Sequence, residues 1–157
     1  MLSHLESHKV LTANQHGFVK KRSCLTNLLE SLESWTKLLD EGKGLDVLYL
    51  DYQKAFDTVP HRRLLAKLKW YGIDGKLLLW IENFLINRKM RVVVNDAVSV
   101  WTDVLSGVLQ GSVLDPLLFV IYVNDIPSVV HNNIKMFADD TNIWSPIVTV
   151  DDAAGLQ

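Results

Sequence analysis

A chain of 157 residues is long enough to bury a core without disulfides, and its composition, 48% hydrophobic and 22% charged, excludes a fibrous or disordered polypeptide. The single cysteine, Cys24, excludes an internal disulfide framework and favours an intracellular, reducing compartment; we expect it to be half-buried. No apolar stretch reaches membrane-spanning length, which argues against a membrane partner, and a net charge of −2 is not that of a basic nucleic-acid-binding domain.

The first half of the chain predicts three helices and one strand. Leucines recur at helical spacing between residues 25 and 39, and Gly42 can end that helix. The run LDVLYL, residues 45–50, predicts a short buried strand bounded by acids. Pro60 suits a helix start, so we expect a helix from there to Tyr71 and a further helix over residues 77–87.

The second half predicts strand pairs around one buried helix. Residues 90–101 read as two strands about an Asn-Asp turn, and SGVLQGS, residues 106–112, reads as a loop. A buried helix is predicted over residues 114–122, followed by a final hairpin whose turn contains Asp139 and Asp140. Local strand pairs mixed with packed helices indicate an α+β fold rather than a doubly wound parallel sheet.

Acids stand at the expected strand ends. Asp51 closes the LDVLYL strand with Asp57 just beyond it, Asp46 lies at its other end, and Asp139 with Asp140 occupy the tip of the last hairpin. If the two strands are neighbours, Asp51 and the Asp139–Asp140 pair converge at one end of the sheet. Grouped carboxylates repel one another unless a cation lies between them, which makes such a group a candidate site for Mg²⁺.

Two readings of the paired acids remain open at this point. Two adjacent aspartates can simply form a solvated turn, and composition and spacing do not exclude that reading. A two-metal site for phosphoryl transfer is the other, because two bound ions can stabilise the attacking and leaving oxygens of an in-line displacement.

Four ordered blocks of the sequence resemble reverse transcriptases. LDVLYLDYQKAFDTVPH (45–61), SGVLQGSVLDPLLFVIYVNDI (106–126) and KMFADDTNIW (135–144) are similar to the palm motifs of that family, and QHGFVKKRSCLTNLLESL (15–32) resembles the segment that precedes the palm in non-LTR retrotransposon polymerases. The resemblance implies an RNA-directed DNA polymerase, a nucleotidyltransferase that extends a DNA primer on an RNA template with deoxynucleoside triphosphates.

The resemblance assigns roles to individual residues. Asp51, Asp139 and Asp140 are implied to be the catalytic, metal-binding acids, joined by the backbone carbonyl of Tyr52, with two Mg²⁺ ions or Mn²⁺ as cofactor. The residues implied to contact the incoming nucleotide are the aromatic sugar gate Phe56 and the pair Gln110 and Gly111.

Further residues receive lesser roles. Asp57 is expected to cap the helix that follows it. Three basic clusters are candidates for phosphate contacts: Lys20, Lys21 and Arg22; Arg62 and Arg63; and Arg88, Lys89 and Arg91. Leu109 and Asp115 depart from the family pattern, which usually has Pro at the first position and a small residue at the second.

The resemblance also implies a domain layout for this one partial polymerase. Residues 1–44 correspond to the end of the fingers and a helical lead-in, residues 45–146 to the palm and residues 147–157 to a tail. Most of the fingers and all of the thumb are expected to lie outside this chain, in the parent element. The alternative function is an inactive relic that keeps the palm motifs; a two-metal nuclease is a rival that only the paired acids support.

Overall fold

Helices and antiparallel strands alternate along the chain in this computed structural model, which describes residues 1–148 and 152. They form two compact units. The helical unit comprises Met1–Val10 and Lys54–Tyr122, and the sheet unit comprises Leu11–Gln53 and Val123–Gln157. The mixture of helices and antiparallel sheet confirms the α+β prediction. Of the predicted tail, only residues 147, 148 and 152 are described, so the rest of that prediction lies outside the described residues.

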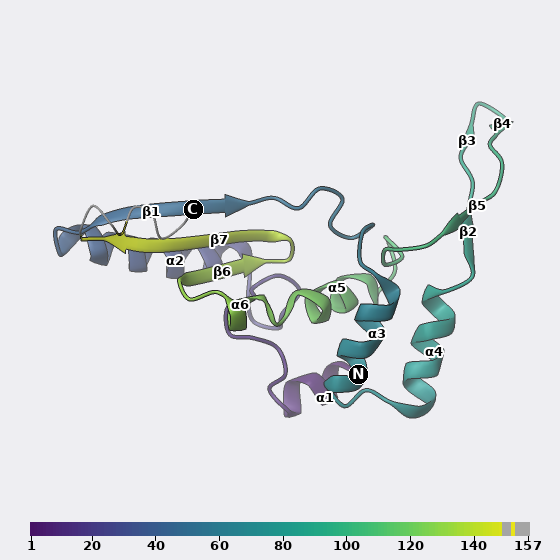
Figure 1. The fold of residues 1–157 in the computed structure, drawn as a ribbon, viewed down its shortest axis with the longest axis horizontal. Helices are drawn as coiled ribbons and strands as arrows, with labels where there is room; N and C mark the ends of the chain where they lie inside the picture. The colour runs from purple at the N-terminus through teal and green to yellow at the C-terminus, as the bar shows by residue number, and fades with distance from the viewer. Residues whose placement is uncertain (149–151, 153–157) are drawn as a thin grey trace. The chain divides into compact units, whose positions relative to one another are not determined.

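A three-stranded antiparallel sheet organises the sheet unit (Figure 1). Its order is β1 (Gly44–Leu50), β7 (Asp140–Ile147) and β6 (Asn133–Phe137), so the strand predicted near residue 45 pairs directly with the last hairpin. The strand and the hairpin are confirmed, but the predicted burial of the strand is wrong. Because β1 is an edge strand of the sheet, none of its residues is buried, and Leu48 and Tyr49 are exposed. The side chains of Ile134, Met136 and Ile143 are buried on one face of this sheet. These apolar residues alternate with more exposed ones along the two strands, as expected for a half-buried sheet.

Helix α2 (Cys24–Asp40) covers the other face of the sheet. Its Trp35 packs edge-on against Trp144 of β7, with 5.9 Å between the ring centroids. The helix itself was predicted correctly, but the leucines that predicted it are not its buried side. The buried residues of α2 are Asn27 and Ser31, whereas the exposed fractions of its leucines range from 47 to 64% for Leu25, Leu28, Leu29, Leu32 and Leu39.

Two sequence expectations at helix starts are corrected by the structure. Cys24 is exposed rather than half-buried, because it is the first residue of α2 and lies beyond the part of the helix that packs on the sheet. Asp57 does not cap the next helix: α3 (His61–Trp70) follows Pro60 and has no side-chain cap, since Asp57 lies too far before its first turn.

Four helices build the helical unit. Helix α3 packs against α4 (Gly75–Leu85), and the buried residues of this pair include Leu64, Leu68, Ile81 and Leu85. The short α1 (Leu2–Ser7) contributes the fully buried Leu5. Helix α5 (Asp115–Val123) carries the most continuous apolar run and is buried as predicted, with Leu118 and Ile121 at 0% exposure. Neither α1 nor the four-residue α6 (Ile126–Val129) of the sheet unit was predicted.

The predicted strand pair at residues 90–101 is present as two short ladders in an arm that follows α4 (Figure 1). Strand β2 (Arg88–Met90) pairs with β5 (Thr102–Val104), and β3 (Val93–Val94) pairs with β4 (Ala97–Val98). Asn95 and Asp96 both have positive φ, as the tight turn between β3 and β4 requires.

None of the helices described at residues 1–148 combines the length and apolar character needed to cross a membrane.

Candidate active site

The three aspartates predicted to bind metal lie at the same end of the three-stranded sheet. Leu50, the last residue of β1, pairs with Thr141 of β7, so Asp51 follows at the position that faces Asp140. Asp140 in turn pairs with Phe137 across the β6–β7 hairpin, and Ala138 and Asp139 form the turn between them. The strand register therefore brings together acids that are far apart in sequence. Asp46 pairs with Ser145 farther along β1 and is not part of this group.

The aspartates at this end of the sheet are open to ligands. Asp51 and Asp140 are exposed and Asp139 is half-buried, whereas the neighbouring Ala138 and Thr141 are buried. A hollow of about 270 Å³ lies beside them, between the first turn of α2 and the ends of β1 and β7. Asp51, Asp140 and Cys24 are among the residues that line it. Carboxylates on the rim of an open hollow can accept a cation or a phosphate-bound cation.

The donor chemistry at this end of the sheet fits Mg²⁺ in type. Carboxylate oxygens are hard ligands, and Mg²⁺ is usually held by one or two carboxylates together with water and substrate phosphates. Within the described part of the chain, no three His, Cys, Asp or Glu side chains are grouped closely enough to hold a metal unaided. The remaining ligands would therefore come from the backbone, from water and from bound phosphates.

The residues predicted to contact the nucleotide belong to the helical unit. Phe56 is half-buried, and its ring stacks on Phe119 of α5 with 4.2 Å between centroids. Gln110 and Gly111 lie in the exposed loop before α5, and nothing lies within 4 Å of the place where a Cβ on Gly111 would be. Their role toward a nucleotide stays a prediction.

Backbone hydrogen bonds join this loop to the segment that contains Phe56. Val108 N donates to Phe56 O at 2.9 Å, and Gly107 N donates to Val59 O at 2.8 Å. Ser106 Oγ adds a hydrogen bond to Asp57 O at 2.8 Å. The two motifs of the helical unit thus form one hydrogen-bonded structure, although about fifty residues separate them.

Comparison with known proteins identifies the family. The family described as reverse transcriptase (RNA-dependent DNA polymerase) matches residues 1–149. The chain belongs to the reverse transcriptase family.

Several of its relatives are polymerases of non-LTR retrotransposons, which confirms the resemblance drawn from the motifs. The chain is 30% identical over 127 residues to a probable RNA-directed DNA polymerase from transposon X-element of Drosophila melanogaster, covering 81% of this chain and 14% of the relative. It is 30% identical over 137 residues to an RNA-directed DNA polymerase from mobile element jockey of Drosophila funebris, covering 82% and 15%. A Pol polyprotein from element R2 of Popillia japonica is 33% identical over 103 residues, covering 65% and 17%. The chain thus spans about a sixth or less of these relatives.

One of the two departures from the reverse transcriptase pattern has a clear physical consequence. Asp115 is only 4% exposed, and its Oδ1 atom has no hydrogen-bond partner. Burial and the nearby charge of Asp57 raise the pKa of the Asp115 carboxyl, and Arg88 opposes them. Leu109, the other departure, is 42% exposed.

The basic residues predicted to contact phosphates divide into exposed and structurally engaged side chains. Lys20, Lys21, Arg62 and Arg63 are exposed. Arg88 instead donates to the carbonyls of Leu85 and Gly107, both at 2.8 Å. In the arm, Lys89 lies 3.6 Å from a carboxylate oxygen of Asp103, and Arg91 lies over the ring of Trp101. Contact with a nucleic acid stays a prediction for all of them.

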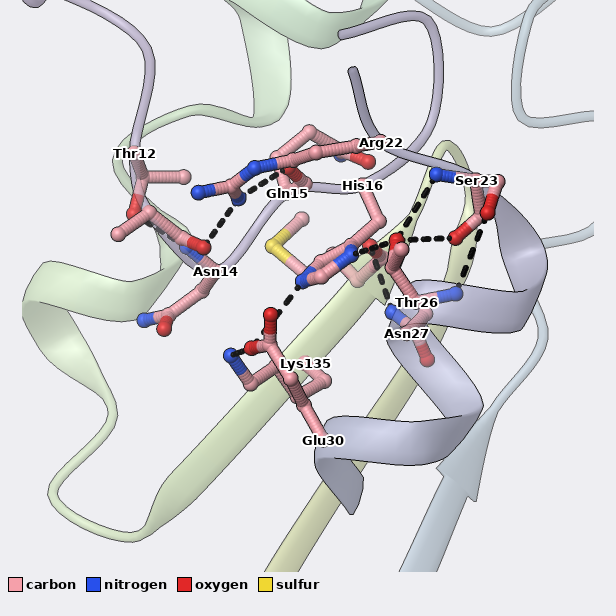
Figure 2. A network of polar contacts seen from close by, with 12 residues as sticks. Thr12, Asn14, Gln15, His16, Arg22, Ser23, Thr26, Asn27, Glu30 and Lys135 are labelled. Atoms are coloured by element: carbon pink, nitrogen blue, oxygen red, sulfur yellow. Dashed lines mark hydrogen bonds and ion pairs between the residues drawn. The ribbon is translucent and has the colours of Figure 1, made fainter. Parts of the chain in front are cut away.

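Sequence reasoning missed the structural role of the segment before α2 (Figure 2). His16 is 1% exposed; its Nδ1 lies 2.9 Å from Thr26 Oγ1 and its Nε2 lies 3.5 Å from a Glu30 carboxylate oxygen. Burial lowers the His16 pKa despite the opposing effect of Glu30. Arg22, predicted only as a phosphate contact, donates to the backbone carbonyls of Ala13 and Gln15. The polar composition of QHGF gave no signal for this role, because it does not show which side chains and backbone carbonyls the folded segment brings into contact.

Proposed function

We propose that this chain forms the palm of an RNA-directed DNA polymerase of non-LTR retrotransposon type, with Asp51, Asp139 and Asp140 as its catalytic, metal-binding acids. One observation carries the proposal: the register of β1, β7 and β6 brings these acids to one end of one sheet. Membership of the reverse transcriptase family supports the same reading. The substrates would be deoxynucleoside triphosphates and a DNA primer on an RNA template.

The three acids would hold two Mg²⁺ ions, with the Tyr52 carbonyl as a further ligand. Bound there, the ions would promote attack by the primer 3′-hydroxyl and stabilise the leaving pyrophosphate. The protein would contribute by holding the three carboxylates in place at the ends of the strands. Phe56, Gln110 and Gly111 would contact the sugar and base of the nucleotide, and the exposed lysines and arginines would contact phosphates. Residues 1–44 would represent the end of the fingers and a lead-in, and residues 45–146 the palm.

Metal binding to aspartate variants tests the proposal. Mn²⁺ binding by the 157-residue chain can be followed by the loss of the free-ion signal in electron paramagnetic resonance. Asp51→Asn and Asp139→Asn should each weaken binding about tenfold or more, since changes that merely disturb a metal ligand already cost this much. Asp46→Asn is the matched control, because Asp46 lies on β1 but outside the group. Equal affinities in all four proteins would refute the assignment of these acids.

A second candidate is a folded remnant that lacks polymerase activity. Asp115 at the start of α5 favours it, because this carboxyl is buried with an Oδ1 atom that has no hydrogen-bond partner, where a family member usually carries a small residue. Primer extension on an RNA template separates the two candidates when the chain is tested within a longer polymerase that supplies the other segments.

A further inference from the structure

The outer edge of β6 is occupied by the segment that contains Gln15. Met136 N donates to Asn14 O at 2.9 Å, and His16 N donates to Met136 O at 2.8 Å. These two bonds form a parallel bridge between Gln15 and Met136. The segment therefore runs parallel to β6, and Gly17 lies against Ala138 of the turn that carries Asp139.

The side chain of Gln15 binds both backbone polar groups of Ala138. Its Oε1 accepts from Ala138 N at 2.9 Å and its Nε2 donates to Ala138 O at 3.3 Å. Oε1 also accepts from Gly17 N at 2.7 Å. Gln15 is fully buried, so water does not compete for these bonds. A primary amide suits the task because it carries a donor and an acceptor together, which a carboxylate or a hydrocarbon side chain does not.

Ala138 needs such support because of its backbone conformation. Its φ is +56°, a region in which a residue with a Cβ is strained by about 1–2 kcal/mol. The residue is only 5% exposed, so its N–H and C=O would lack partners without Gln15. The Ala138 carbonyl belongs to the peptide that joins Ala138 to Asp139. Holding this carbonyl therefore fixes the orientation of that peptide, which includes the Cα atom that carries the Asp139 side chain.

We propose that Gln15 is a positioning residue for Asp139: its amide locks the Ala138–Asp139 peptide and so directs the Asp139 carboxylate at the end of the sheet. The inference rests on the proposed function of Asp139 as a metal ligand. Gln15 does not itself contact metal or substrate.

Two substitutions of Gln15 test the proposal in the 157-residue chain. Gln15→Met keeps the length of the side chain and removes all three hydrogen bonds. Gln15→Glu keeps an acceptor for Ala138 N and Gly17 N, replaces the donor to Ala138 O with a second oxygen, and places an acidic group at a fully buried position. The matched control is Thr26→Val, which removes the bonds of Thr26 Oγ1 with His16 and Ser23 but no contact with the turn.

Two measurements are made on each variant that remains folded. Amide exchange by NMR reports the protection of Ala138 N–H, and Mn²⁺ titration followed by electron paramagnetic resonance reports metal affinity. Gln15→Met should speed exchange at Ala138 and weaken Mn²⁺ binding about tenfold or more, as expected for a group that supports a metal ligand. Gln15→Glu should give a smaller loss of affinity. Thr26→Val should lower the urea midpoint and leave Mn²⁺ affinity unchanged. A loss of Mn²⁺ affinity in Gln15→Met would then not be explained by lower stability alone.

The outcomes distinguish this inference from the proposed function. Wild-type Mn²⁺ affinity in both folded Gln15 variants, with a loss in Asp139→Asn, would overturn the positioning role and leave the metal site intact. If Asp139→Asn itself binds like the wild type, the metal site is refuted, and the amide exchange decides the role of Gln15 in the turn. If the amide exchange rate of Ala138 N–H is the same in Gln15→Met as in the wild type, Gln15 does not hold the turn and the proposal is overturned. Should Gln15→Met fail to fold, Gln15→Glu decides by the same two measurements.

Discussion

A Cβ atom added to Gly17 would lie 2.3 Å from the backbone nitrogen of Ala138. No side chain fits at that distance, so the glycine is what allows the segment of residues 14–17 to approach the turn of the β6–β7 hairpin. This close approach connects the start of the sheet unit to the aspartates near its end.

Gly17→Ala should therefore destabilise the chain. The neighbouring atoms of Ala138 are backbone and cannot move aside cheaply, so overpacking should cost about 1–3 kcal/mol. Urea unfolding monitored by circular dichroism measures the loss. Gly42→Ala is the control: unlike Gly17, Gly42 has nothing within 4 Å of its missing Cβ, and its φ is +73°, so this variant reports the cost of backbone strain without a clash. A Gly17→Ala variant as stable as the wild type would contradict the close approach of the Gln15 segment to Ala138.

Ser23 and Thr26 form a capping box at the start of α2. Ser23 Oγ accepts from Thr26 N at 3.2 Å, and Thr26 Oγ1 accepts from Ser23 N at 2.9 Å. Ser23→Ala removes one of these bonds and should lower the free energy of unfolding by about 1 kcal/mol. Ser23→Asp can restore the acceptor and should recover most of the loss. Equal stability of the alanine and aspartate variants would contradict a capping role.

Asp115→Ser should stabilise the chain at neutral pH by about 1–3 kcal/mol, because it removes a buried acceptor that has no partner. The pH dependence follows from the direction of the pKa shift. The folded state raises the Asp115 pKa and binds the proton more tightly than the unfolded chain does. This carboxyl therefore favours folding at acidic pH, and its contribution is lost as pH rises from the ordinary carboxyl pKa through the raised one.

Urea midpoints measured from acidic to neutral pH test this prediction. The gap between Asp115→Ser and the wild type should widen as pH rises. Asp103→Ser, which removes an exposed carboxylate of the arm, serves as the control. A constant gap for Asp115→Ser would contradict the raised pKa.

The 157-residue chain by itself should extend a primer weakly or not at all. Phosphoryl transfer needs the reactants held in register, an effect that reaches roughly 7–11 kcal/mol at its limit. The chain spans only 14% of the X-element polymerase, and exposed Asp51 and Asp140 on a chain of net charge −2 repel template and primer. Primer extension on RNA with Mg²⁺, compared with Asp139→Ala, provides the measurement. Strong extension by the wild type and none by the variant would show the prediction wrong.

Phe56→Ala, made within a longer polymerase that contains this chain, should increase ribonucleotide incorporation relative to deoxyribonucleotide if Phe56 is the sugar gate. The change also removes the stack on Phe119, so some loss of stability is expected. Phe56→Leu separates the effects, because it retains an apolar contact while reducing bulk. Sugar discrimination that stays unchanged in both variants would remove Phe56 from the proposed nucleotide contacts.

The sequence by itself determined the order and type of the main elements and the family. Apolar patterns identified α2, β1, α3 and α5, and in α3 and α5 apolar residues of the pattern are also buried. The motifs around Asp51 and Asp139 identified the reverse transcriptase family, because the acids and their neighbours are adjacent in sequence. Short elements such as α1 and α6 carry too few residues to leave such a pattern.

Only the tertiary structure decided which surfaces of those elements are buried and what holds the aspartates in place. The leucines of α2 predicted a helix but not its packing, which depends on Asn27, Ser31 and Trp35 meeting the sheet. The convergence of Asp51 with Asp140 depends on strand register, and the support of Ala138 depends on Gln15, 123 positions away. Every residue except proline has the same backbone N–H and C=O groups, so the partner of a glutamine side chain depends on which backbone group lies near it in the folded chain. A single sequence does not show this.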